Sequence, residues 1–390
     1  MKWRGKEVKG LLISKKGEYL EIKLPSGYNI MLNEKEVEIL KEEEFERGYV
    51  KGEEGEGEVR IIGCGGTIGS KVDYETGGVS PKISADELVA QYPEIRNIAT
   101  VETRMLFSML SENMNQEHWE KIVEEVKKAF EERKKVVLLH GTDTMHYTAS
   151  ALAFAFKGMP SPIVLTGSQR SSDRPSSDAW FNLLNAIYTS KQEFGESVIV
   201  MHSSINDDEG VVLRGVRARK MHSTRRDAFK PINESPLAFV DFRKGVEWLN
   251  KPIEPINDWK VENGFSRKVA LIYVYPGIEE GVFDYYKAYD GVVLVGTGMG
   301  HIPTSIIDKI KELNIVVMTT QTIYGRINLD VYSTGRLLKE AGVLGHGLDI
   351  TPEAAFVKLS WILYRTKERT KVKELFYTNM ANEFSLRSVI

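Results

Sequence analysis

Two short segments of the chain combine residue types that could do chemistry. The first is Gly63–Gly69, in which the hydroxyl of Thr67 stands among glycines directly after an apolar run. The second is His140–Met145, in which Thr142 and Asp143 follow another apolar run. A hydroxyl held at a strand end among free backbone amides is the arrangement of a nucleophile beside an oxyanion hole. The two segments together therefore indicate a site for nucleophilic catalysis.

Each segment also has a simpler explanation. Glycines serve tight turns as well as close ligand approach, and Thr142 or Asp143 could cap a helix that begins after them. The dinucleotide fingerprint G-x-G-x-x-G fails, because Ile68 stands where its last glycine is needed, and Gly296–His301 fails at the same point. No G-x-x-x-x-G-K-[ST] phosphate loop is present. Taken singly these residues favour a structural role, whereas two such strand ends in one sheet favour a site.

A third group of interest is the basic run from Arg214 to Arg226, which contains Lys220 and His222. On its own, Lys220 is most simply a surface charge. The run could contact RNA phosphate or an acidic partner, but a solvated face is the commoner explanation.

Metal catalysis has little support in the sequence. The histidines are His118, His140, His146, His202, His222, His301 and His346. None belongs to an H-E-x-x-H motif, so His140 and His146 are expected to be structural. We expect no cofactor to be bound by this chain.

The elements that must position these residues follow from composition and pattern. The 390 residues are 42% hydrophobic and 27% charged with a net charge of −3, which excludes wholesale disorder and allows two or three domains. From residue 59 onward, short apolar runs alternate with helical segments, which predicts an α/β fold with mainly parallel sheets. Chemistry in such a fold lies beyond the carboxyl ends of the strands. We place one α/β domain at 59–250 and a second at 266–390, separated by a polar, Pro-containing segment.

The first 50 residues have a different pattern. Short alternating runs separated by turn residues predict a small β-module, barrel-like because so short a domain must close its own edges or pack on a neighbour. Residues 34–58 contain eleven Glu against four Lys or Arg, and residues 51–58 are interpreted as an acidic linker or a simple spacer. Cys64 is the single cysteine, the chain opens without a signal-like segment, and no apolar run approaches about 20 residues. These features predict a cytoplasmic protein that does not interact with membranes.

The combination of Gly65–Ile68 with His140–Met145 resembles the paired signatures of the bacterial-type asparaginase family. Tyr74–Gly78, Ser111–Met114 and Phe181–Ala186 are similar to further segments of that family, and the resemblance covers about residues 59–390. The family's fold has two α/β domains.

The resemblance implies specific roles. Thr67 would attack the side-chain carboxamide of Asn or Gln, releasing ammonia from an acyl-enzyme, and Tyr74 would activate it, although Tyr74 could equally be a surface aromatic. Lys220 would act as a base towards Thr142, oriented by Asp143. Gly66, Ser111 and Asp143 would bind the substrate. If Thr67 is not the nucleophile, Thr142 is the next candidate.

Two positions differ from many relatives. Cys64 stands where a Ser or Thr is common, and Glu112 stands where many standalone asparaginases have Gln. The second change leaves the preference between Asn and Gln open. The family completes its sites across a homodimer, and Gly298, Met299 and His301 are the candidates for that contribution.

Within the family, the β-module and the sequence of residues 72–77 look most like the asparaginase-like subunits of archaeal glutamyl-tRNA(Gln) amidotransferases. The implied partner is the kinase-type subunit of such an amidotransferase, which would hold ATP, Mg and Glu-tRNA(Gln) and form Gln-tRNA(Gln), and the module would dock partner or tRNA. The implied enzyme class is that of the glutamine-hydrolysing glutaminyl-tRNA synthases. The alternatives are a standalone L-asparaginase with an accessory domain, and a non-catalytic RNA- or protein-binding module.

Overall fold

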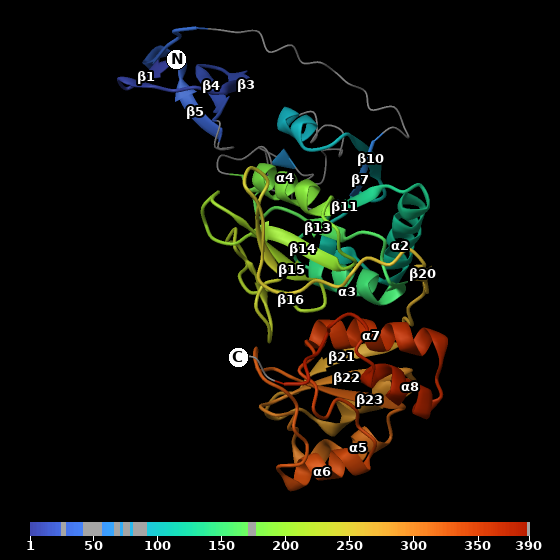
Figure 1. Cartoon of the computed structure of the whole chain (residues 1–390). Coiled ribbons are helices and arrows are strands. Elements are labelled where there is room, and N and C mark those ends of the chain that lie inside the picture. The colour runs from blue at the N-terminus through green and yellow to red at the C-terminus, as the bar shows by residue number, and fades with distance from the viewer. Residues whose placement is uncertain are drawn as a thin grey trace.

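The computed structural model describes residues 1–24, 29–41, 57–65, 71–72, 79–80, 92–170 and 177–387. Figure 1 shows a small blue β-module at the N-terminus, a green and yellow α/β domain, and an orange and red α/β domain at the C-terminus. The α-helices in the described ranges are α2 (Gln116–Glu131), α3 (Met145–Ala155), α4 (Ala179–Ser190), α5 (Ile307–Lys311), α6 (Ser333–Glu340), α7 (Pro352–Arg365) and α8 (Arg369–Tyr377).

The first α/β domain is built on an eight-stranded sheet of order β10-β7-β11-β13-β14-β15-β18-β19. These strands are β7 (Val59–Gly63), β10 (Val101–Met105), β11 (Lys135–Leu139), β13 (Ile163–Thr166), β14 (Ser197–His202), β15 (Gly210–Arg214), β18 (Ala238–Asp241) and β19 (Gly245–Trp248). The first five in spatial order are parallel, and the last three continue antiparallel. The predicted α/β fold with a mainly parallel sheet is confirmed.

Both faces of this sheet are covered, which explains why its strands read as continuous apolar runs. In β11, Val136 and Leu138 join the core under α2 and α3, whereas Val137 and Leu139 join the core under α4. The alternation is the two-residue period of a strand buried on both sides.

The second α/β domain has a three-stranded parallel sheet of order β21-β22-β23, formed by β21 (Val269–Tyr273), β22 (Gly291–Gly296) and β23 (Ile315–Thr320). Helix α7 packs on one face of this sheet. Residues of α5 and α6 contribute to the core on the other face, with Phe283 from a 3-10 helix (Glu280–Ala288).

The two α/β domains share one hydrophobic core. Helix α3 is apolar on nearly all sides, and it packs against α7 of the second domain as well as against its own sheet. One continuous cluster runs from Ile62 through Leu152 to Trp361 and Phe376. The segment between the domains also contributes β20 (Lys260–Val261), which pairs antiparallel with β12 (Phe156–Lys157) after α3.

The predicted N-terminal β-module is present. It contains two three-stranded sheets, of order β2-β1-β6 and β3-β4-β5, around a core of Leu20, Ile22 and Leu32. The strands are β1 (Lys2–Trp3), β2 (Lys6–Glu7), β3 (Leu11–Lys16), β4 (Tyr19–Lys23), β5 (Asn29–Asn33) and β6 (Val37–Glu38).

The boundary of the first α/β domain lies slightly before residue 59. Gly57 is buried, its carbonyl accepts a 2.8 Å bond from Lys134 Nζ, and the Glu58 N–H donates to Thr100 Oγ1. These last two residues of the predicted linker are therefore bound to the α/β domain. Residues 51–56 lie outside the described ranges.

The remaining short strands are β8 (Lys71–Val72), β9 (Val79–Ser80), β16 (Ala218–Lys220) and β17 (Phe229–Pro231). β8 pairs with β9, and β16 pairs antiparallel with β17, bringing Lys220 opposite Phe229. The β16–β17 pair is separate from the main sheet and carries the lysine of the predicted site.

Candidate functional site

The carboxyl ends of β7 and β11 lie side by side in the main sheet. The two strands are parallel neighbours, and the Cys64 N–H donates to the Leu139 carbonyl at 2.8 Å, just beyond the end of β7. Cys64 is buried, and burial raises the pKa of its thiol, so it remains protonated and inert. The Gly-rich segment and the His140–Met145 segment therefore leave the same edge of the sheet.

Gly65 is the last described residue of the Gly-rich segment. Its φ is +84°, and a Cβ there would lie 2.2 Å from the carbonyl oxygen of Met109. Only glycine fits this turn. Gly66, Thr67 and Tyr74, to which we assigned substrate binding and catalysis, lie outside the described residues, so their roles stay predictions.

Lys220 brings the other predicted catalytic residues together. Its Nζ donates to Thr142 Oγ1 at 2.8 Å and to Asp143 Oδ1 at 2.7 Å, although Lys220 is 77 or more positions away along the chain. Thr142 is buried and the Lys220 side chain is 11% exposed, whereas the Asp143 side chain is 66% exposed. A hydroxyl with an adjacent amine is arranged for proton transfer, and the open carboxylate can meet a substrate cation.

Neither Thr142 nor Asp143 caps α3. The residue at the N-cap position is Thr144, which makes no side-chain capping bond. Its Oγ1 instead donates to the carbonyl of Ser111 at 2.8 Å. This bond ties the buried Ser111 to the start of α3, so the structure brings Ser111, Thr142, Asp143 and Lys220 to one place.

His140 is a buried, neutral side chain that supports this segment. Thr148 Oγ1 accepts a hydrogen bond from Trp119 Nε1, so its own proton is free to be donated to His140 Nε2 at 2.9 Å. The ring proton of His140 is then on Nδ1, which donates to the Gly141 carbonyl at 2.7 Å. Burial lowers the His140 pKa to about 4. The ring therefore fixes the backbone before Thr142 without carrying charge.

A second buried network, which the sequence reasoning did not find, holds the loop after β13. The Asp178 carboxylate accepts bonds from the backbone N–H groups of Gln169 and Arg170 at 3.0–3.1 Å and from Asn182 Nδ2 at 3.1 Å. Asn182 Oδ1 pairs with His202 Nδ1 at 2.6 Å. The signal available in the sequence is the spacing of Asp178 and Asn182, two polar residues four positions apart at the N-cap and in the first turn of α4.

The basic run differs from the solvated face that composition favoured. Arg214, Arg217 and Arg226 are buried. Arg214 donates hydrogen bonds to the carboxylates of Glu196 and Glu234. Arg217 donates to the backbone carbonyls of Asp349 and Asn382, and Arg226 donates to the Asp207 carboxylate. These cations are used in internal pairing, because planar guanidinium groups satisfy several buried acceptors at once.

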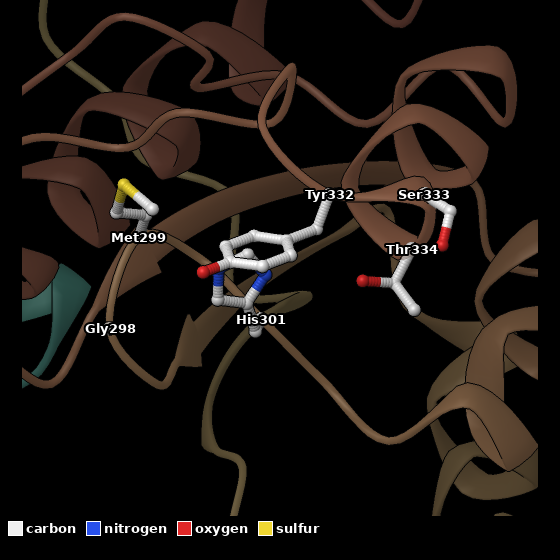
Figure 2. Close-up of a pocket in the computed structure, with 6 residues that line it drawn as sticks. All are labelled: Gly298, Met299, His301, Tyr332, Ser333 and Thr334. Atoms are coloured by element: carbon white, nitrogen blue, oxygen red, sulfur yellow. The ribbon is translucent and has the colours of Figure 1, made fainter.

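An open pocket of about 480 Å³ lies in the second α/β domain, at the carboxyl end of β22. Figure 2 shows its lining by Gly298, Met299 and His301 of the loop after β22 and by Tyr332, Ser333 and Thr334 at the start of α6. The rings of His301 and Tyr332 meet edge to face at 4.9 Å. The three residues nominated for completing a site thus line one concave surface.

Metal sites and membrane spans are two further features that a chain of this length could contain. Within the described ranges, no group of three or more His, Cys, Asp or Glu side chains is placed to hold a metal ion. None of the helices in the described part of the chain has the length and apolar character that crossing a bilayer requires.

Comparison with known proteins gives a consistent set of relatives. Residues 58–254 match the model of the asparaginase N-terminal domain, and residues 268–376 match that of the glutaminase/asparaginase C-terminal domain. The chain is 44% identical to the D-type subunit of the glutamyl-tRNA(Gln) amidotransferase of Thermofilum pendens, covering 94% of this chain and 86% of the relative. It is likewise 44% identical to the corresponding subunit of Pyrococcus abyssi, covering 95% of this chain and 88% of that relative.

Solved structures of similar fold include the thermostable L-asparaginase from Thermococcus kodakarensis, with a TM-score of 0.75 and 32% identity over 84% of this chain and 99% of that one. L-asparaginase I from Vibrio cholerae gives a TM-score of 0.72 and 28% identity, with the same coverage.

Proposed function

Because this chain belongs to the asparaginase family, we propose that it is the ammonia-releasing subunit of a tRNA-dependent amidotransferase. The observation that carries the amide chemistry is the joint contact of Lys220 Nζ with Thr142 Oγ1 and Asp143 Oδ1. The choice of an amidotransferase follows from the relatives that match nearly the whole chain.

The proposed reaction proceeds in two steps. The Thr67 hydroxyl, assisted by Tyr74, attacks the carboxamide carbon of Asn or Gln, the C–N bond breaks, and ammonia leaves with the proton that the hydroxyl gave up. Water then attacks the ester and releases Asp or Glu, restoring the hydroxyl. Thr142 and Lys220 transfer protons during these steps, since their contact is short and largely shielded from water.

The substrate would be held by its α-amino and α-carboxylate groups. Asp143 gives one oxygen to Lys220 and is 66% exposed, so its other oxygen is available for an α-ammonium group. Gly66 and Ser111 are assigned to the same pocket. These groups suit an amino-acid amide substrate.

The relatives' names indicate a subunit of a glutamyl-tRNA(Gln) amidotransferase, and the particular partners are those that the family resemblance implies. A separate kinase-type subunit would bind ATP and Mg and activate Glu-tRNA(Gln), and the ammonia made here would convert it to Gln-tRNA(Gln). This chain itself would bind no cofactor. A homodimer of the asparaginase type would complete each site, with the pocket of Gly298, Met299 and His301 as the contributing edge.

A standalone L-asparaginase with an accessory domain is the second candidate. The solved asparaginases cover 84% of this chain, whereas the amidotransferase subunits cover 94–95%. The amidotransferase subunits thus match a part of the chain that the asparaginases do not, and we attribute that part to the β-module, which favours the amidotransferase. A purely binding role would not require the contact of Lys220 with Thr142 and Asp143.

The test is ammonia release from Asn and from Gln by the purified full chain, alone and then with a kinase-type partner, ATP and Glu-tRNA(Gln). We expect release that depends on partner and tRNA, together with formation of Gln-tRNA(Gln). Strong release by the chain alone, unchanged by partner and tRNA, would instead establish a standalone asparaginase. Silence in every condition would favour a binding role.

Two variants test the assigned chemistry. Lys220→Met should lower kcat by about 10²- to 10⁴-fold, the usual contribution of a positioned proton-transfer group. Thr67→Ala should abolish hydrolysis. If Thr67→Ala retained normal turnover, the nucleophile assignment would move to Thr142.

A further inference from the structure

The strand that carries Lys220 is held from its opposite side by the second α/β domain. Successive side chains of a strand point to opposite sides, so Arg219 faces away from Lys220 in β16. Arg219 Nε lies 3.1 Å from Glu353 Oε1, and Nη2 donates to the Tyr273 hydroxyl at 3.2 Å. Both partners belong to the second domain, on α7 and β21.

Glu353 is a rigid and buried anchor. It lies in the first turn of α7, where the Thr351 side chain caps the helix by accepting from the Ala354 N–H. Glu353 is 6% exposed. His146 Nε2 lies 4.0 Å away, but burial and the nearby cations lower the His146 pKa to about 3, so this ring is neutral. Burial raises the pKa of Glu353, and Arg219 opposes that shift by supplying the positive charge that a buried carboxylate needs.

Arg217 anchors the same side of the strand. It is 1% exposed and donates to the carbonyls of Asp349 and Asn382 and to Ser385 Oγ. Strand β16 is three residues long, and β17 is the single strand that pairs with it among those the structure describes. So short a pairing fixes a strand weakly, and the side chains of Arg217 and Arg219 tie this strand to the second α/β domain.

We propose that Arg219 is a positioning residue for Lys220, held by Glu353, so that the second α/β domain sets the contact of Lys220 with Thr142. The kinetic consequence of this proposal rests on the amide hydrolysis proposed above. Its structural part concerns the placement of one amine and can be measured without turnover.

The first measurement is ammonia release by Arg219→Gln and Glu353→Gln with the kinase-type partner, ATP and Glu-tRNA(Gln) present, the conditions in which the wild type is expected to be active. We expect kcat to fall about 10- to 100-fold with little change in KM, because a displacement of about 1 Å has effects of this size. The control is Arg225→Gln, which removes an arginine of the same run whose partner is Asp227, and should leave kcat unchanged. In a Lys220→Met background, Arg219→Gln should lower the residual rate no further, since coupled residues are non-additive. A merely structural role would lower it again.

The second measurement is the rate at which formaldehyde and a borohydride methylate the Lys220 amine, followed by peptide mass spectrometry. Lys251, 83% exposed, serves as the internal reference. Arg219→Gln and Glu353→Gln should raise the labelling of Lys220 several-fold, and Arg225→Gln should not. Unchanged labelling in the folded variants would overturn the proposal, as would additive kinetics. A silent wild type with increased labelling in the variants would reject the proposed function and retain the positioning role.

Discussion

A buried ion pair that fixes the C-terminal segment gives a sharp stability prediction. Lys358 and Glu383 are both fully buried. The three protons of Lys358 Nζ are donated to the carbonyls of Phe376 and Thr378, at 2.8 and 2.6 Å, and to Glu383 Oε1 at 2.5 Å. Lys358→Met removes all three donors and leaves a buried carboxylate supported by the backbone N–H groups of Met380 and Ala381. Removing one partner of such a pair costs about 3–5 kcal/mol of unfolding free energy.

The assay is urea unfolding of the full chain at fixed protein concentration. The double variant Lys358→Met/Glu383→Gln removes the stranded charge and should recover part of the loss, since neighbouring partners couple. The matched control is Lys371→Met on α8, an exposed lysine paired with Glu368, which should change stability by less than about 0.5 kcal/mol. The reasoning is refuted if Lys358→Met matches the control, or if the double variant is no more stable than Lys358→Met.

Three further predictions concern the site and its supports. The His140 pKa is about 4 in the folded chain against 6.5 in the unfolded chain, so its contribution is complete above pH 6.5 and lost as the pH falls towards 4. Between pH 7 and pH 5 this amounts to about 2 kcal/mol in urea unfolding, and His140→Gln should show a flatter pH dependence, whereas equal slopes would contradict the assignment. Asp178→Asn places an amide where the carboxylate accepts backbone N–H groups, so it should cost about 2 kcal/mol and speed amide exchange at residues 169 and 170. Unchanged exchange there would count against it. Gly65→Ala should abolish ammonia release or folding, because its Cβ would meet the Met109 backbone at 2.2 Å; Gly281→Ala, with nothing within 4 Å, should be neutral, and equal effects of the two changes would contradict the turn geometry.

The sequence predicts those parts of the fold that have strong local patterns. The β11 and β14 runs are apolar at residues 136–139 and 198–201, and the structure forms strands there. The antiparallel strands β15, β18 and β19 were not predicted, and the last of them is partly exposed. Short strands of this kind depend on pairing with neighbours, which no local pattern encodes.

The site shows the same division between local and distant information. The segment containing Thr142 and Asp143 was recognisable as a strand end, whereas Lys220 was indistinguishable from its basic neighbours without the family resemblance. Its burial results from the pairing of β16 with β17 and from contacts 77 or more positions away. The internal pairing of Arg217 likewise requires acceptors more than 130 positions distant.

The core that α3 shares with α7 has a consequence for how the molecule can move. Many two-domain enzymes open and close by a hinge between their halves. Here such a rotation would separate Leu152 and Phe154 from Trp361 and Phe376, which belong to one continuous buried cluster. Exposing that apolar surface to water would be prohibitively unfavourable. Substrate entry and ammonia exit must therefore be compatible with two α/β domains that stay packed together.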